Sequence, residues 1–199
     1  MNLYPNVPRY FIERYFGATE LGIFATMAYT VTAGIKLVDS LAQSVGPRLA
    51  GHHASGNESQ FRMVLLKAMG IGLLFGAAGI LLALFGGSTI LTVFYGKEYA
   101  GYPSVLVWLA VAGAVECVSS FQYWTITAAR RFVIQIPLYA VVVGVGIAAS
   151  FWLVPTYGMR GAAIAYAIAA TVRLCGGLAI IMHILYTLHS RVSHKQGTR

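Results

Sequence analysis

Charged residues are scarce in this chain of 199 residues. Only 10% of the positions are charged and 58% are hydrophobic, whereas soluble domains average about 25% charged residues. A water-soluble domain of this size could not bury so much apolar surface, and large exposed apolar patches are rare on soluble monomers. The scarcity of charge therefore excludes an ordinary soluble domain and indicates a protein whose exterior faces lipid.

Other absences narrow the possible functions. Both cysteines, Cys117 and Cys175, lie inside apolar runs, so the sequence has no disulfide framework. Asp39 is the single aspartate, which excludes a metal-binding Asp-x-Asp pair. No Ser/His/Asp or Cys/His set falls at one membrane depth. We therefore expect a protein that is not an enzyme, with no catalytic residues, metal or cofactor. The first ten residues contain two prolines and no apolar run, unlike a signal peptide.

Five apolar stretches are long enough to cross a membrane as helices, because a hydrocarbon core of about 30 Å needs about 20 apolar residues. They cover approximately residues 21–45, 63–85, 104–128, 132–154 and 161–187. Breaker residues follow three of them, at Gly46-Pro47, Gly86-Gly87 and Pro155. The pattern predicts an all-α integral membrane bundle of about five helices within residues 1–188. A basic tail over residues 189–199 follows. Two aromatic segments, residues 2–16 and 88–102, are expected at the membrane–water interface.

Small residues recur at helical spacing within two of these stretches. Gly72 and Gly76 form a small-xxx-small pair, and the last stretch is rich in alanine from Ala162 to Ala170. Small residues let helix backbones approach closely in lipid, so these positions predict helix–helix contacts.

The net charge of +8 has a topological explanation. Basic residues lie at the ends of the apolar runs, which indicates membrane orientation and anionic lipid as the partner, not nucleic acid. Loops on the N-terminal side carry four basic residues and those on the other side eight, which predicts an outside N-terminus and a cytoplasmic C-terminus. The first set is Arg9, Arg14, Lys97 and Arg160; the second is Arg48, Arg62, Lys67, Arg130, Arg131, Arg191, Lys195 and Arg199.

Ionisable residues inside the predicted spans mark the candidate functional site, because such residues usually face a bundle interior or a wet cavity. They are Lys36, Asp39, Glu116 and Arg173. Polar companions follow at steps of three, four or seven: Tyr29, Thr32 and Gln43 in the first span, Ser120 and Tyr123 in the third, and Tyr166 in the fifth. The pattern predicts an aqueous cavity that admits a charged head group. The alternative is internal ion pairing, of Lys36 with Asp39 and of Glu116 with Arg173, that only holds the bundle together.

Four segments carry a resemblance to a known family. They are VPRYFIERYFGATELGIFATMAY (residues 7–29), QSVGPRLA (43–50), ILTVFYGKEYAGY (90–102) and VPTYGMRGAAIAYAIA (154–169). Together they resemble the oligosaccharide flippases of bacterial polysaccharide biosynthesis. These are the Wzx-like O-antigen transporters of the multidrug/oligosaccharidyl-lipid/polysaccharide superfamily.

The resemblance implies a two-lobed transporter, of which this chain matches the end of helix seven and helices eight to twelve. It implies that undecaprenyl-pyrophosphate-linked glycan crosses the bacterial cytoplasmic (inner) membrane for lipopolysaccharide or O-antigen synthesis. Expected partners are membrane lipid, the lipid-linked oligosaccharide and the missing N-terminal half of the transporter. On this interpretation Lys36 and Arg173 meet phosphate near the midplane and Arg9 meets it at the outer mouth, while Asp39 and Glu116 orient these cations or carry coupling protons.

Two alternatives remain open from the sequence. One keeps the superfamily but changes the substrate, to a drug or a peptidoglycan precursor. The other is a truncated membrane subunit that packs against a partner and transports nothing.

Overall fold

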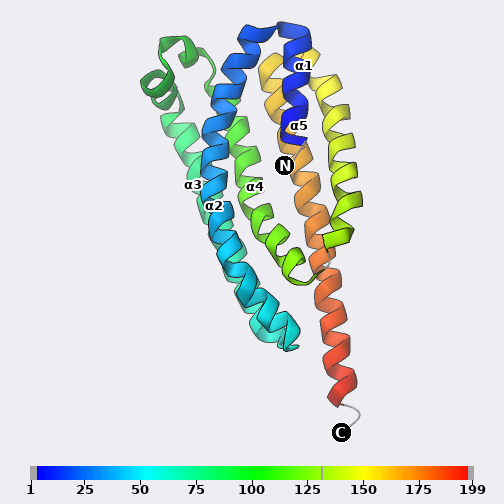
Figure 1. The fold of residues 1–199 in the computed structure, drawn as a ribbon. Coiled ribbons are helices and arrows are strands. Elements are labelled where there is room, and N and C mark those ends of the chain that lie inside the picture. Colours follow the sequence, from blue (N-terminus) through cyan, green and yellow to red (C-terminus); the bar gives the residue numbers. More distant parts are fainter. Residues whose placement is uncertain (1–3, 131, 197–199) are drawn as a thin grey trace.

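The computed structural model describes residues 4–130 and 132–196, and the regular elements in this part of the chain are helices. A short 3-10 turn, η1 (Tyr4–Asn6), leads into α1 (Val7–Phe16), which is followed by α2 (Ala18–Ala54) and α3 (Glu58–Tyr95). Then come η2 (Lys97–Gly101), α4 (Pro103–Ala128), η3 (Phe132–Ile134) and α5 (Gln135–Gln196). The long helices lie side by side as an elongated bundle (Figure 1).

The 62-residue α5 is two helical arms joined at Gly158, where φ is 57° and ψ is −138°. We call residues 135–157 the first arm and residues 159–196 the second arm. The arms run antiparallel: a Cβ added at Gly146 would lie 3.6 Å from Ala169, and one at Gly176 would meet Leu138. The chain therefore turns back at Gly158, within the predicted connection between the fourth and fifth stretches, although the first arm continues past Pro155. Figure 1 shows the two arms side by side.

The predicted helices are present, but two run past their predicted ends. Pro47 lies inside α2, and α3 continues through Gly86 and Gly87 to Tyr95. Gly46 is buried, and a Cβ there would lie 3.8 Å from the Trp124 ring. Packing against a neighbouring helix thus accompanies the continuation of α2 through Pro47, a residue that lacks a backbone N–H.

The opening segment, η1 and α1, packs along the bundle. Tyr4, Val7, Pro8 and Ile12 are buried, and α1 packs against α5. The end of α1 is near the bend of α5, since a Cβ at Gly158 would lie 3.7 Å from the Phe16 ring. The apolar side of this short helix therefore packs against protein, and its place at the membrane–water interface stays a prediction.

The core centres on α4, which packs against α2, α3 and α5. Close backbone approach explains the small residues: a Cβ at Gly72 would lie 2.9 Å from the Cys117 carbonyl oxygen, and one at Gly76 would lie 2.8 Å from Ala114 Cα. The alanines of the second arm are buried as well, including Ala162, Ala163, Ala165, Ala167, Ala169 and Ala170. The sequence prediction that these residues form helix–helix contacts is confirmed.

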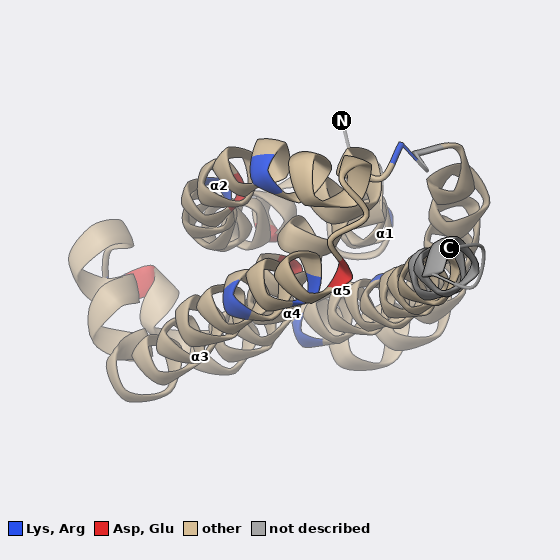
Figure 2. Cartoon of the chain, turned by 90° about the horizontal axis from the view of Figure 1, so that it is seen from below, with Lys and Arg blue, Asp and Glu red and all other residues tan. Residues whose placement is uncertain are grey.

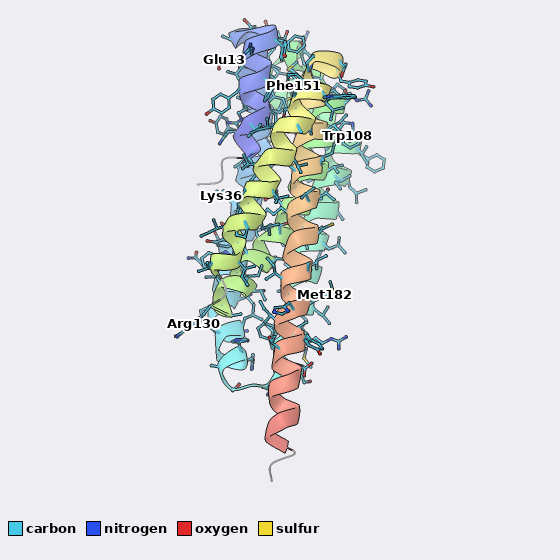
Figure 3. The ribbon with its side chains drawn as sticks, turned by 90° about the vertical axis from the view of Figure 1, so that its right-hand side faces the viewer. Glu13, Lys36, Trp108, Arg130, Phe151 and Met182 are labelled. Carbon is cyan, nitrogen blue, oxygen red and sulfur yellow. The ribbon has the colours of Figure 1, made fainter. Side chains whose placement is uncertain are left out.

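The bundle's outer surface is largely apolar and uncharged. Leu73, Leu82 and Phe85 of α3 are exposed, as are Phe151 and Met182 on the two arms of α5 (Figure 3). Figure 2 shows that most positions along the helices are residues other than Lys, Arg, Asp and Glu. Within the described residues, four helices are long and apolar enough to cross a membrane: α2, α3, α4 and α5 as far as Thr187.

Candidate functional site

A buried ion pair joins α4 to the second arm of α5. The Arg173 guanidinium donates to Glu116 Oε2, and both side chains are almost fully enclosed, at 9% and 6% exposure. Tyr4 completes the cluster: its hydroxyl donates to Glu116 Oε1 and accepts a 2.9 Å hydrogen bond from Arg173 Nη1. Glu116, Arg173 and Tyr4, here called the buried triad, thus satisfy one another inside the bundle.

Aromatic rings surround the buried triad. The Arg173 guanidinium lies 5.8 Å from the ring centroid of Tyr4 and 5.5 Å from that of Tyr139. Tyr166, buried at 8% exposure, stands 6.1 Å from the Tyr4 ring. Because aromatic faces attract a desolvated cation, these rings add to the ion pair in holding the guanidinium. The triad links three segments that are far apart in sequence: the start of the chain, α4 and the second arm of α5.

A second set of polar side chains follows an outward face of α2. We call Tyr29, Thr32, Lys36, Asp39 and Gln43 the α2 polar face. Lys36 Nζ and Asp39 Oδ2 are 4.0 Å apart, and their side chains are 74% and 36% exposed. Trp124 Nε1 of α4 donates a 3.2 Å hydrogen bond to Asp39 Oδ1, which ties the face to the neighbouring helix.

A cation from α1 adjoins the α2 polar face. The Arg9 guanidinium lies over the Tyr29 ring, 4.7 Å from its centroid. Arg9 Nε is buried without a hydrogen-bond partner, and Tyr29 is 62% exposed. The polar face therefore extends from Arg9 and Tyr29 along α2 to Gln43.

The structure divides the predicted site residues into two groups. Glu116, Ser120, Arg173 and Tyr166 are buried, whereas Lys36, Tyr29 and Gln43 are exposed. Arg9, Thr32 and Asp39 are half-buried beside the exposed group, and Tyr123 is 38% exposed. The ion pairs Lys36–Asp39 and Glu116–Arg173, which the sequence offered as the alternative to a cavity, are both formed.

Sequence reasoning missed Tyr4, Trp124, Gln135 and Tyr139. Tyr4 and Tyr139 looked like ordinary aromatic residues, and their place beside Arg173 depends on how α1 and α5 pack. Gln135 lies at the start of the first arm and is buried. Among the described residues, no group of three His, Cys, Asp or Glu side chains could hold a metal ion.

These features define the class of the molecule as an all-α bundle whose long helices are apolar enough to cross a membrane and whose helix α2 carries exposed polar residues. The particular likeness is to the capsular polysaccharide biosynthesis protein CapF of Staphylococcus aureus, which is 28% identical over 173 residues. The match covers 87% of this chain and 44% of CapF, so the chain spans less than half the length of that relative. No protein-family model matches the chain. No solved structure matches it either.

Proposed function

We propose that this chain forms part of a membrane transporter that moves a lipid-linked saccharide across the bacterial cytoplasmic membrane during polysaccharide biosynthesis. The observation that carries the proposal is the α2 polar face, which is exposed on a bundle whose other outer surfaces are mostly apolar. The similarity to a capsular polysaccharide biosynthesis protein supports the biosynthetic context.

The energetics of α2 argue for a hydrated surface. A charged side chain at the centre of a bilayer costs about 2.5–3.5 kcal/mol on insertion scales, and Lys36 is 74% exposed. Water or a polar partner along the α2 polar face removes most of this cost. A transport path beside α2 supplies such an environment, and so does a second set of helices that closes the path from the other side.

The chemistry of the α2 polar face suits the head group of a lipid-linked saccharide. Arg9 and Lys36 are cations that can meet phosphate oxygens, and Tyr29 and Gln43 can meet sugar hydroxyls. An isoprenoid tail needs no polar path, since it can stay in lipid. The buried triad is closed to such a substrate in this conformation, so we assign it to holding the bundle together and leave the path to the exposed residues.

The substrate's route sets the expected orientation. In a bacterial cell the lipid-linked glycan is made on the cytoplasmic side, so transport runs outward. Basic residues are more frequent near the α2–α3 and α4–α5 connections, and this end of the bundle is proposed to lie in the cytoplasm. The start of the chain and the bend at Gly158 then lie toward the outside. The proposed activity makes no covalent change in the substrate and needs no cofactor.

Thiol labelling tests whether the α2 polar face is wet. Lys36→Cys and Leu37→Cys are neighbours at one depth, and both native side chains are more than two-thirds exposed. In membranes, with Cys117 and Cys175 replaced by Ala, we expect a membrane-impermeant maleimide to modify Lys36→Cys at least about tenfold faster, because the reactive thiolate needs water. Equal rates at the two positions would remove the observation on which the proposal depends.

A transport assay tests the function itself. We expect that deleting the gene from its host abolishes surface polysaccharide and raises the pool of lipid-linked glycan on the inner leaflet. The wild-type gene should restore export, and Lys36→Ala should restore it less well than the control Leu73→Ala, which alters an apolar exposed position. Normal glycan export in the deletion strain, with loss of drug efflux or of peptidoglycan precursor export, would favour the other substrates. No transport defect at all would favour a non-transporting subunit.

A further inference from the structure

A hollow opens between α4 and the first arm of α5, and it shares no lining residue with the α2 polar face. It has a volume of about 360 Å³ and is lined by Tyr123, Gln135, Ile136 and Tyr139. A small extension of about 10 Å³ shares Tyr123, Gln135 and Tyr139 with it and reaches Ser119 and Arg173. We call the two together the Tyr123–Tyr139 hollow. Its mouth is aromatic and its inner end is polar.

Two buried polar atoms in the Tyr123–Tyr139 hollow have no hydrogen-bond partner in the protein. They are Ser119 Oγ and Gln135 Nε2, on side chains that are 1% and 6% exposed. Buried polar groups are nearly always paired, because an unpaired one loses its hydrogen bonds with water and gains nothing in return. The inner extension has room for about one water molecule. Two unpaired groups on one hollow therefore point to a hydrogen-bonding occupant.

The charges around the hollow decide what kind of occupant fits. Arg173 is the charged side chain among the described residues that line it, and Glu116 neutralises that guanidinium from behind. An anion entering the hollow would compete with the Glu116 carboxylate for the same donors. An uncharged ligand with several hydroxyl groups meets no such competition. It can pair directly with the amide of Gln135, and a water molecule in the inner extension can connect it to the hydroxyl of Ser119.

The aromatic mouth favours the same occupant. A sugar ring carries most of its hydroxyl groups around its edge and apolar C–H groups on its faces. These faces can pack on aromatic rings such as those of Tyr123 and Tyr139. Tyr123 is 38% exposed, and its ring stands edge-on to Trp124, with centroids 5.5 Å apart. We propose that the Tyr123–Tyr139 hollow binds an uncharged sugar ring, which in terms of the proposed function is a sugar of the lipid-linked glycan.

The test measures binding of a free sugar to the full chain. With the protein in lipid nanodiscs and N-acetylglucosamine as the probe, saturation-transfer NMR is expected to show transfer to the sugar protons. Gln135→Leu should weaken binding about fivefold to tenfold, as for the loss of one good hydrogen bond. Because this variant removes an unpaired buried amide, its unfolding temperature should stay the same or rise. If Gln135 had a purely structural role, Gln135→Leu would lower the unfolding temperature together with sugar binding.

The matched control is Gln60→Leu, the same substitution at an exposed position near the start of α3. It should leave sugar binding unchanged. No transfer to the sugar with wild-type protein, or equal weakening by Gln60→Leu, would overturn the proposal. The proposal would also be overturned if inorganic pyrophosphate bound in a way that depended on Gln135 and the sugar did not bind.

Failure of the sugar-binding proposal can be distinguished from failure of the proposed transport function. Glycan export without Gln135-dependent sugar binding would overturn this inference and leave the transport function standing. Gln135-dependent sugar binding in a protein that supports no export would support the site and contradict transport.

Discussion

The buried triad is expected to contribute strongly to the stability of the bundle. Glu116→Gln keeps the size of the side chain but leaves the buried Arg173 guanidinium without a compensating charge. Removing one partner of a buried ion pair typically costs about 3–5 kcal/mol, so we expect a loss of about 3 kcal/mol or more in the free energy of unfolding. Titration of the purified protein in mixed micelles with a denaturing detergent, followed by far-UV circular dichroism, measures this change.

The exposed pair provides the internal comparison. Lys36→Met breaks the pair with Asp39. The two charged atoms are 4.0 Å apart and Lys36 is exposed to 74%, so the expected cost is below about 1 kcal/mol. The double variant Glu116→Gln with Arg173→Gln removes both buried charges and should recover most of the loss caused by Glu116→Gln alone. The reasoning is refuted if Glu116→Gln costs no more than Lys36→Met, or if the double variant loses the sum of the two single losses.

Three further predictions follow from single contacts and use the same unfolding assay. Gly76→Ala should cost about 1–3 kcal/mol because the added Cβ would lie 2.8 Å from Ala114. The control Gly79→Ala, whose Cβ would have nothing within 4 Å, should be neutral or stabilising. Equal effects of the two substitutions would contradict the close approach of α3 and α4. Gly158→Ala should cost about 1–3 kcal/mol because a left-handed φ of 57° with ψ of −138° suits glycine alone, and an unchanged stability would argue against this bend. Tyr4→Phe should cost about 1 kcal/mol or more in the free energy of unfolding, because it removes the hydroxyl that hydrogen-bonds to Glu116 and Arg173. An unchanged stability would show that the Tyr4 hydroxyl does not contribute to the buried triad.

Much of the fold can be predicted from hydrophobic runs. The helices lie where the apolar stretches predict them, because each stretch is long enough to satisfy its own backbone hydrogen bonds in lipid. The ends were less well predicted, since Pro47 and the pair Gly86-Gly87 are inside helices. Breaker residues act through local preferences of a few kcal/mol at most, and contacts with neighbouring helices can outweigh them.

The candidate site was only partly predictable. Helical spacing grouped Tyr29, Lys36 and Gln43 on one face of α2, and that face is exposed in the structure. Spacing alone could not decide whether Glu116 and Arg173 meet each other or a cavity. That choice depends on how α4 turns toward the second arm of α5.

The sequence by itself determined that the chain is helical, that its exterior is apolar and that a few charges lie within the helices, because length, periodicity and composition act locally. Tertiary structure alone decided which charges are enclosed. The return of the chain at Gly158 and the packing of α1 against α5 bring Tyr4, Glu116 and Arg173 together, while Lys36 stays outside. Helix rotation and close backbone contact set these pairings, and neither is encoded in the spacing of a single segment.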